Sequence, residues 1–325
     1  MNELFIFAHL SDPHLTSLCN IRVRDLLNKR ALGYLSWHLH RRFEYRGEVL
    51  AALVRDLQGI RPEHIIITGD LTHLGLPCEF LEAKKWLHSL GPPSQVTVIP
   101  GNHDAYVGTD RDHTFVHWLE YMVSDAGQDH VGKKSDIRTL FPSLRIRHET
   151  AFIGLSSARP SKPFFALGSV GQVQLKKLGH ILAQTGRQGL FRIVMIHHPP
   201  QPGIMTWRRR LTDSRELRSL IAQQGVEMVL HGHAHRSSMA WLKTPAGLAP
   251  AIGVPSASAT SRKSGHNAGY NVYSLSQNAH GWEVAVEVRG YVPKERCFIV
   301  KDKSRLVLPC LSGPTGVVTA KVQRT

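Results

Sequence analysis

Five short motifs rich in aspartate, histidine and asparagine follow one another along the chain. They are Asp12-Pro13-His14, Gly69-Asp70, Gly101-Asn102-His103-Asp104, His197-His198 and Gly232-His233-Ala234-His235. Together they supply carboxylate, imidazole and carboxamide groups but no thiolate, which suits hard or borderline divalent ions rather than Cu(I) or an iron–sulfur cluster. Any one of these motifs alone occurs often by chance. All five, each directly after an apolar run, predict a metal site.

Each motif follows a short apolar stretch that is typical of a buried strand. The stretches are residues 4–10, 64–68, 95–99, 190–196 and 226–230. Branched, apolar runs of this length suit strands covered on both faces. The motifs are therefore expected at the carboxyl ends of strands, where open α/β sheets place their sites. Side chains at i and i+2 of an extended segment project to the same side, so Asp12 and His14 could converge, as could His233 and His235.

Helical periodicity occupies the segments between these strands. Apolar residues recur at three- and four-residue spacing in residues 46–58, 79–90, 111–124, 169–185 and 213–224. Ser169 with Gln172, and Asp213 with Glu216, have the spacing of a capping box. Alternating strands and helices predict an α/β layered domain. After residue 236 only strand-like runs follow, including residues 270–275 and 282–288, and we interpret them as closing strands of a second sheet.

Length and composition favour one elaborated domain over two independent ones. A chain of 325 residues with 42% hydrophobic content can bury a large core. No low-complexity linker or internal repeat divides it. We expect a single domain over residues 1–300 and a C-terminal extension over residues 301–325, whose sequence indicates no chemistry.

The order of the five motifs resembles that of the calcineurin-like metallophosphoesterase superfamily over residues 10–235. The resemblance implies an α/β fold, a four-layer sandwich of two mixed β-sheets flanked by α-helices. It also implies two divalent or mixed-valence transition-metal ions, Mn, Fe or Zn, at the strand ends. The implied ligands form two sets that share Asp70. One set is Asp12, His14, Asp70 and His235, and the other is Asp70, Asn102, His197 and His233.

The resemblance leaves His103 unligated as the acid–base residue, with Asp104 fixing its ring. Two divalent ions carry more positive charge than Asp12 and Asp70 can neutralise, so the site favours an anionic substrate and a deprotonated bridging water. We expect a metal-bound hydroxide to attack phosphorus, while His103 protonates the leaving alkoxide or orients the phosphoryl oxygens. The alternative is that His103 only braces its turn. His198 is expected to support the site without binding metal.

The connection between His14 and Asp70 is longer than a strand–helix–strand unit requires. Residues 20–45 place basic residues among leucine and aromatic residues, and Gly33 is expected to separate two short helices. The basic residues are Arg22, Arg24, Lys29, Arg30, Arg41 and Arg42. This mixture suits an anionic membrane surface or an amphiphilic ligand. A lid packed on the core, with a solvated basic face, is an equal alternative.

A second basic run, Arg208 to Arg210, lies between His197 and the Gly-His-x-His motif. Guanidinium groups can clasp phosphate oxygens in pairs. For at least two of the three arginines, however, a solvated charge run is the preferred interpretation.

Several classes of substrate remain compatible with the metal motifs. We expect a small phosphoester or nucleotide-containing substrate and favour a phosphodiester. Two alternative activities are a UDP-diacylglucosamine-type pyrophosphatase that acts at the membrane surface and a nuclease. The net charge of +15 is compatible with nucleic acid. No zinc finger, RNA-recognition signature or basic helix-turn-helix accompanies it, so sequence-specific nucleic-acid binding is not expected. A non-enzymatic scaffold is disfavoured because every ligand position is filled.

Targeting signals are absent from the sequence. The first apolar run is interrupted by His9 and Asp12 and lacks a basic leader, unlike a signal peptide. No stretch approaches the ~18 apolar residues that cross a bilayer. Four cysteines, without Cys-x-x-Cys spacing, are expected to stay reduced. They are Cys19, Cys78, Cys297 and Cys310. We therefore expect a cytoplasmic protein, with peripheral association with the inner membrane as an alternative.

Overall fold

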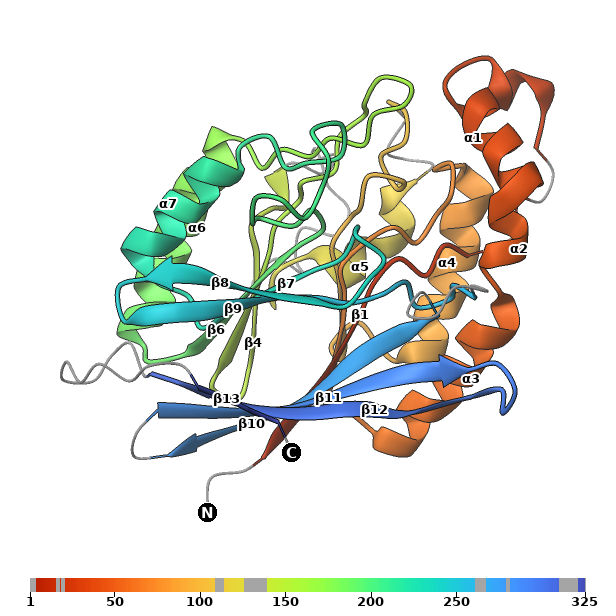
Figure 1. Ribbon diagram of the computed structural model, residues 1–325. Coiled ribbons are helices and arrows are strands. Elements are labelled where there is room, and N and C mark those ends of the chain that lie inside the picture. Colours follow the sequence, from red (N-terminus) through yellow and green to blue (C-terminus); the bar gives the residue numbers. More distant parts are fainter. Residues whose placement is uncertain are drawn as a thin grey trace.

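Two mixed β-sheets face each other, with helices on their outer sides (Figure 1). The computed structural model describes residues 4–15, 18, 21–108, 114–125, 139–260, 267–278, 281–309 and 321–324. The first sheet has the strand order β13-β12-β11-β10-β1-β2-β3. These strands are β1 (Phe5–Leu10), β2 (His64–Ile67), β3 (Val96–Val98), β10 (Gly269–Asn278), β11 (Gly281–Val292), β12 (Cys297–Leu308) and β13 (Lys321–Arg324). Strands β1, β2 and β3 run parallel, and β10 joins β1 antiparallel.

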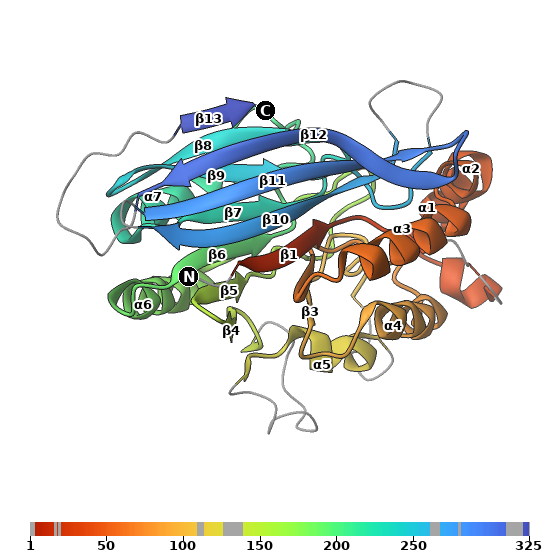
Figure 2. The same cartoon turned by 90° about the horizontal axis from the view of Figure 1, so that it is seen from below.

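The second sheet has the strand order β4-β5-β6-β7-β9-β8. Its strands are β4 (Ser143–Arg147), β5 (Thr150–Gly154), β6 (Phe191–Ile196), β7 (Met228–His231), β8 (Ser238–Thr244) and β9 (Gly247–Gly253). Strands β5, β6, β7 and β9 are parallel, and β4 and β8 form antiparallel edges. Figure 2, seen from below, shows β10–β12 lying across β7–β9.

The helices cover the sandwich on two flanks. The long ones are α3 (Gly47–Ile60), α4 (Pro77–Leu90), α6 (Gln172–Arg187) and α7 (Ser214–Gln224). Figure 1 shows α6 and α7 together on one flank and α3 and α4 on the other. One buried cluster, including Phe7 and Phe152, fills the space between the sheets, and a second, including Leu178 and Ile221, joins the second sheet to α6 and α7. The predicted sandwich of two mixed sheets flanked by helices is confirmed.

Three element boundaries differ from the sequence-based expectation. Residues 301–308, expected to begin an extension, belong to β12, which pairs with β11 on one side and with β13 on the other. The expected helix over residues 111–124 is instead a 3₁₀ turn (Phe115–Trp118) followed by the short α5 (Leu119–Met122), and residues 111–113 lie outside the described residues. The expected helix at 169 begins at Gln172.

The segment after His14 forms one helical run rather than two helices separated by Gly33. It contains a 3₁₀ turn (Val23–Leu26), α1 (Arg30–Ser36), a π-helical turn (Trp37–Arg41) and α2 (Arg42–Glu44). Gly33 lies in the middle of α1, where an added Cβ would lie 2.5 Å from Leu74 Cδ2 and 2.6 Å from the Tyr106 hydroxyl oxygen. The glycine therefore allows α1 to pack closely on the loops below it. We call residues 21–45 the helical insert.

No helix in the described part of the chain is long and apolar enough to cross a membrane. Of the four cysteines, Cys19 and Cys310 lie outside the described residues, and Cys297 is a free thiol.

The start of α6 depends on Asp213, the residue just before α7, rather than on a capping box between Ser169 and Gln172. The N-cap position is Gly171, with φ at 82°, which has no side chain to cap the helix. Asp213 instead accepts hydrogen bonds from Val170 N at 3.1 Å, Gly171 N at 2.7 Å and the Ser169 hydroxyl at 2.9 Å. One carboxylate thus connects the beginnings of both helices.

Replacing Asp213 with Ala should lower the free energy of unfolding by about 1–3 kcal/mol, because partly buried donors next to α6 lose their acceptor. Urea unfolding measures the change. Glu216→Ala, at the exposed position expected to complete a capping box, should change stability by less than about 0.5 kcal/mol. An equal effect of the two substitutions would contradict this account.

Candidate metal centre

The carboxyl ends of five strands bring the motif residues to one edge of the sandwich. The ends of β1, β2 and β3 carry Asp12, Asp70 and Asn102, and the ends of β6 and β7 carry His197 and His233. Each sheet supplies parallel strands here, so their carboxyl ends point the same way. Neither sheet alone holds the complete set.

The backbone at these positions is unusual. Asp12, His14, Asp70, His233 and His235 all have positive φ angles, between 40° and 65°. Non-glycine residues in the left-handed region cost of order 1–3 kcal/mol each and concentrate at functional sites. Asp12 and His14 therefore converge through left-handed turns after β1, not through the extended i and i+2 geometry expected from the sequence.

The first candidate group contains Asp12, His14, Asp70 and His235. Its ligand atoms all lie within 4.8 Å of one another. His235 Nε2 is 3.0 Å from Asp12 Oδ1 and 3.4 Å from His14 Nε2, and His14 Nε2 is 4.0 Å from Asp70 Oδ2. Four donor atoms thus face a common point.

The second candidate group contains Asp70, His197 and His233, with Asn102 beside them. His197 Nε2 lies 3.3 Å from Asp70 Oδ2, 3.2 Å from His233 Nδ1 and 3.1 Å from Asn102 Oδ1. Asp70 Oδ2 is therefore near histidines of both groups. The structure brings together all seven residues of the two expected ligand sets.

Backbone carbonyls hold three of these imidazole rings in one tautomer. His14 Nδ1 donates to Thr72 O at 3.0 Å, His197 Nδ1 donates to Thr68 O at 2.7 Å, and His233 Nε2 donates to Arg209 O at 3.0 Å. When each ring is neutral, its other nitrogen presents a lone pair to the site, as in metal-binding histidines. Against the effect of burial, the Asp70 carboxylate raises the pKa of His197 to about 9, so a metal ion bound there would displace a proton. Burial, with the charge of His73, lowers the pKa of His14 well below its ordinary value and favours a neutral ring. This donor set fits two metal ions that share Asp70.

His103 lies beside these groups with its ring oriented by a different partner from the one expected. Its Nδ1 donates to the His73 carbonyl at 2.6 Å, and its backbone N donates to Asp70 Oδ1 at 2.7 Å. Asp104, expected to fix this ring, is fully buried and accepts hydrogen bonds from the backbone N atoms of Asp70, Thr72 and Gly101, each at 2.9 Å. Asp104 therefore ties two ligand-bearing loops together, because its carboxylate is taken up by their amides.

His198 takes the supporting position that the sequence suggested. Its Nδ1 lies 2.8 Å from the Ser157 hydroxyl and its Nε2 lies 3.2 Å from Ala166 O. The His198 ring is 4.3 Å from that of His233. It thus links the loop that contains Ala166 to the metal centre.

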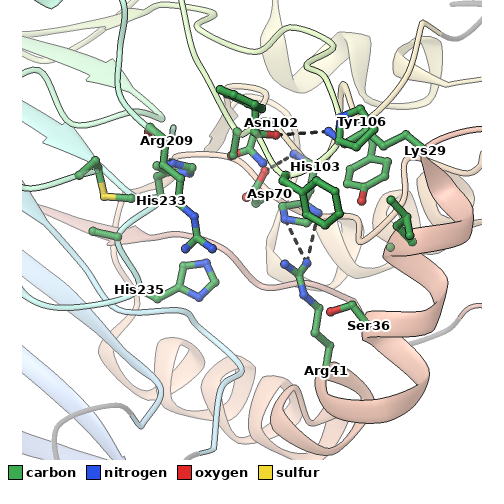
Figure 3. Close-up of a pocket in the computed structure, with 18 residues that line it drawn as sticks. Lys29, Ser36, Arg41, Asp70, Asn102, His103, Tyr106, Arg209, His233 and His235 are labelled. Atoms are coloured by element: carbon green, nitrogen blue, oxygen red, sulfur yellow. Dashed lines mark hydrogen bonds between the residues drawn. The ribbon is translucent and has the colours of Figure 1, made fainter. Parts of the chain in front are cut away.

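A pocket of about 430 Å³ opens over the metal centre. Its floor includes Asp70, Asn102, His103, His233 and His235 (Figure 3). The helical insert forms one wall, and the loop around Phe165 contributes to the rest. The insert residues that line the pocket are Lys29, Leu32, Gly33, Ser36 and Arg41.

Three basic residues of the insert face inward, unlike the solvated basic face expected for a lid. Arg30 is 7% exposed and donates to Leu74 O at 2.9 Å and Gly75 O at 2.6 Å. Lys29 Nζ donates to the Ser161 hydroxyl at 3.1 Å. Arg41 Nη1 donates to His103 Nε2 at 3.1 Å. The expectation of a lid packed on the core therefore describes this part of the insert better.

Sequence reasoning did not place Arg41 in the site. Its neighbour Arg42 is exposed, and the two arginines look equivalent in the sequence. Arg41 ends the π-helical turn, a rare local geometry that often occurs at functional sites. Arg208, Arg209 and Arg210 were candidates for binding phosphate. Arg209 lines the pocket, whereas Arg208 packs over the Trp207 ring, 5.0 Å from its centroid.

Comparison with known proteins agrees with this architecture. Residues 5–237 match the family described as calcineurin-like phosphoesterases. The chain belongs to this family. Among curated members, a "Probable cyclic nucleotide phosphodiesterase" from Rhodococcus erythropolis is 32% identical over 197 residues, which cover 59% of this chain and 57% of the relative. A "cAMP/cGMP dual specificity phosphodiesterase" from Mycobacterium tuberculosis is 28% identical over 240 residues, which cover 73% and 63%. The chain thus spans less than two thirds of these relatives' lengths.

Two solved structures share the fold. A dimetal phosphatase from Danio rerio superposes with a TM-score of 0.55 at 14% identity, covering 91% of this chain and 98% of that one. The purple acid phosphatase from yellow lupin gives a TM-score of 0.57 at 12% identity, covering 94% and 54%. At such low identity the likeness concerns the fold alone.

Metal analysis after reconstitution with Mn²⁺ should give two ions per chain for the unaltered protein and fewer than one for Asp70→Ala. The single substitution removes an atom that lies near both groups of ligands. Asp302→Ala, which removes an exposed carboxylate on β12, should leave two ions. Two ions retained by Asp70→Ala would show that Asp70 is not shared.

Proposed function

We propose that this chain is a dinuclear metal-dependent phosphodiesterase acting on a small or nucleotide-containing phosphoester. The observation that carries the proposal is the pair of ligand groups around Asp70 with His103 at their side. The names of its curated relatives, which include a glycerophosphodiester phosphodiesterase from Enterobacter lignolyticus, support a diester substrate. The oxygen and nitrogen donors suit Mn, Fe or Zn.

In this proposal each of the two ligand groups would hold one metal ion. Asp12, His14, Asp70 and His235 would hold one ion, and Asp70, Asn102, His197 and His233 the other. When bound, two such ions act as Lewis acids and lower the pKa of water, so that it can act as a nucleophile at neutral pH. In hydrolysis, the water oxygen bonds to phosphorus, one ester P–O bond breaks, and the leaving alcohol takes up a proton.

His103 is proposed to supply that proton. Its Nδ1 is held by the His73 carbonyl, so Nε2 is the ring atom that would carry the proton. Nε2 accepts a hydrogen bond from Arg41 in this structure, and it would become free to take up a proton and face the ester oxygen once Arg41 binds the phosphoryl group instead. General acid catalysis of this kind contributes about 10²–10⁴-fold to a rate. The hydrogen bond from His103 N to Asp70 Oδ1 keeps the ring at a fixed place beside the metal centre.

Arg41 and Arg209 are proposed to bind the phosphoryl oxygens. Figure 3 shows the two guanidinium groups on opposite sides of the space over Asp70, one from the insert and one from the loop before α7. Charge-assisted hydrogen bonds from guanidinium groups are stronger than neutral ones and match the geometry of phosphate. The contact between Arg41 and His103 would place the bound phosphoryl group next to the proton donor.

The Mn²⁺-loaded protein should hydrolyse methyl phenyl phosphate and methyl p-nitrophenyl phosphate. His103→Ala should reduce kcat for the phenyl ester by about 10²–10⁴-fold, because its leaving group needs a proton, and should reduce it less for the p-nitrophenyl ester, while keeping two ions per chain. Release of the phenols and metal analysis measure the two properties. No hydrolysis by the fully loaded, unaltered protein would refute the proposed function. Loss of metal in His103→Ala would instead assign this histidine to the ligand set.

Replacing Arg41 with Ala should lower kcat/KM for methyl p-nitrophenyl phosphate by about 10- to 100-fold, because a charged hydrogen bond to the phosphoryl group is lost. Inhibition by inorganic phosphate should weaken in parallel. Arg42→Ala is the matched control and should stay within about twofold, because its side chain is exposed. Equal effects of the two substitutions would remove Arg41 from the site.

A further inference from the structure

One face of the helical insert carries apolar side chains that remain open to solvent. Leu32, Leu35, Leu39 and Phe43 are 46%, 55%, 54% and 54% exposed. Their spacing of three, four and four residues along a continuous helical run places them on one side. We call these four residues the apolar stripe. Val23 and Leu27, nearer the start of the insert, are also exposed, at 81% and 78%.

The apolar stripe begins inside the pocket. Leu32 both lines the pocket and is partly exposed, so its side chain joins the interior to the outer face of the insert. Phe164 and Phe165 also line the pocket, and Phe164 is 78% exposed. Trp207, 61% exposed, packs edge to face against Phe165 at 5.4 Å between ring centroids. Apolar side chains of the insert and of these loops therefore border the mouth of the pocket.

Arginine side chains border the same apolar residues. Arg42 lies over the Phe43 ring, 4.5 Å from its centroid, and Arg208 lies over Trp207. Apolar side chains flanked by cationic groups are typical of surfaces that bind anionic amphiphiles. Exposed apolar surface that is continuous with a pocket marks a binding site more often than scattered single residues do.

The size of the pocket sets a limit on what fits inside it. A volume of about 430 Å³ is near the lower end of the range for small-molecule sites and accommodates a phosphoester with a short ester group. A longer ester group has to leave through the mouth. Leu32 lines the pocket and is also the first residue of the apolar stripe, so an ester group that leaves past Leu32 would meet the stripe.

We infer that the substrate is an amphiphilic phosphoester whose hydrocarbon chain lies on the apolar stripe while its phosphoester is held at the metal centre. This inference rests on the proposed function, because the metal centre fixes the position of the phosphoester. A hydrocarbon chain attached to the bound phosphoester would run from the pocket onto the stripe, which accounts for the continuity of the stripe with the pocket at Leu32. If the stripe bound a second copy of the protein or a lipid bilayer instead, it would not need to be continuous with the pocket.

Two diesters with the same reacting bond test the inference. Methyl and octyl p-nitrophenyl phosphate, both below the concentration at which the octyl ester aggregates, are compared as kcat/KM in Mn²⁺. The octyl ester should be at least about tenfold better, mainly through a lower KM, because methylene groups leave water on binding. In the double variant Leu35→Asp/Leu39→Asp this ratio should fall towards one.

Val173→Asp is the matched control. Val173 is 70% exposed on α6, which lies on the flank opposite the insert in Figure 1. The octyl-to-methyl ratio of this variant should equal that of the unaltered protein. A fall in Val173→Asp as large as in the double variant would mean that added charge, not the stripe, changes the ratio.

The results separate this inference from the proposed function. Hydrolysis of both esters with equal kcat/KM would overturn the amphiphilic substrate and keep the phosphodiesterase. Hydrolysis of neither ester would overturn both. Sedimentation analysis distinguishes another occupant: a dimer that the double variant dissociates, without any chain-length preference, would assign the stripe to a second copy of the chain and overturn the inference.

Discussion

The carboxylate of Asp70 lies where the ends of the two sheets meet, and the candidate site depends on that position. Its Oδ1 accepts a hydrogen bond from the backbone N–H of His103, which lies in the loop after β3 of the first sheet. Its Oδ2 is 3.3 Å from His197 of the second sheet and 4.0 Å from His14 of the first. A rotation of one sheet against the other would separate these atoms. The packing between the sheets therefore determines whether the two groups of ligands can share one residue.

Hydrogen bonds between the loops compensate for the unfavourable backbone of the ligand residues. Asp12 N donates to Gly69 O, His14 N donates to Asp70 O, and His233 N donates to Asp12 Oδ2. Each of these residues has positive φ. Local strain of this kind persists only where the surroundings determine the conformation. Asp104, which binds the loops of both Asp70 and Gly101, belongs to the same support.

The helical insert combines two roles that its sequence leaves unresolved. Arg30 and Lys29 attach it to the loops around the pocket, and Arg41 reaches His103. The adjoining face of the insert keeps exposed leucines and Phe43. A basic, apolar segment can therefore be a lid on one side and a binding surface on the other.

The sequence by itself determined the kinds of candidate ligand, their order and the strands that carry them. Motifs and apolar runs are local signals, and β1, β2, β3, β6 and β7 begin and end within two residues of the predicted stretches. Tertiary structure decided which side chain binds which partner. The His73 carbonyl holds the ring of His103, Asp213 supports α6 from outside that helix, and residues 301–308 extend β12 between β11 and β13. Arg41 and Arg42 are adjacent, yet one enters the pocket and the other faces water. These outcomes depend on contacts between residues far apart in the chain, which override local preference.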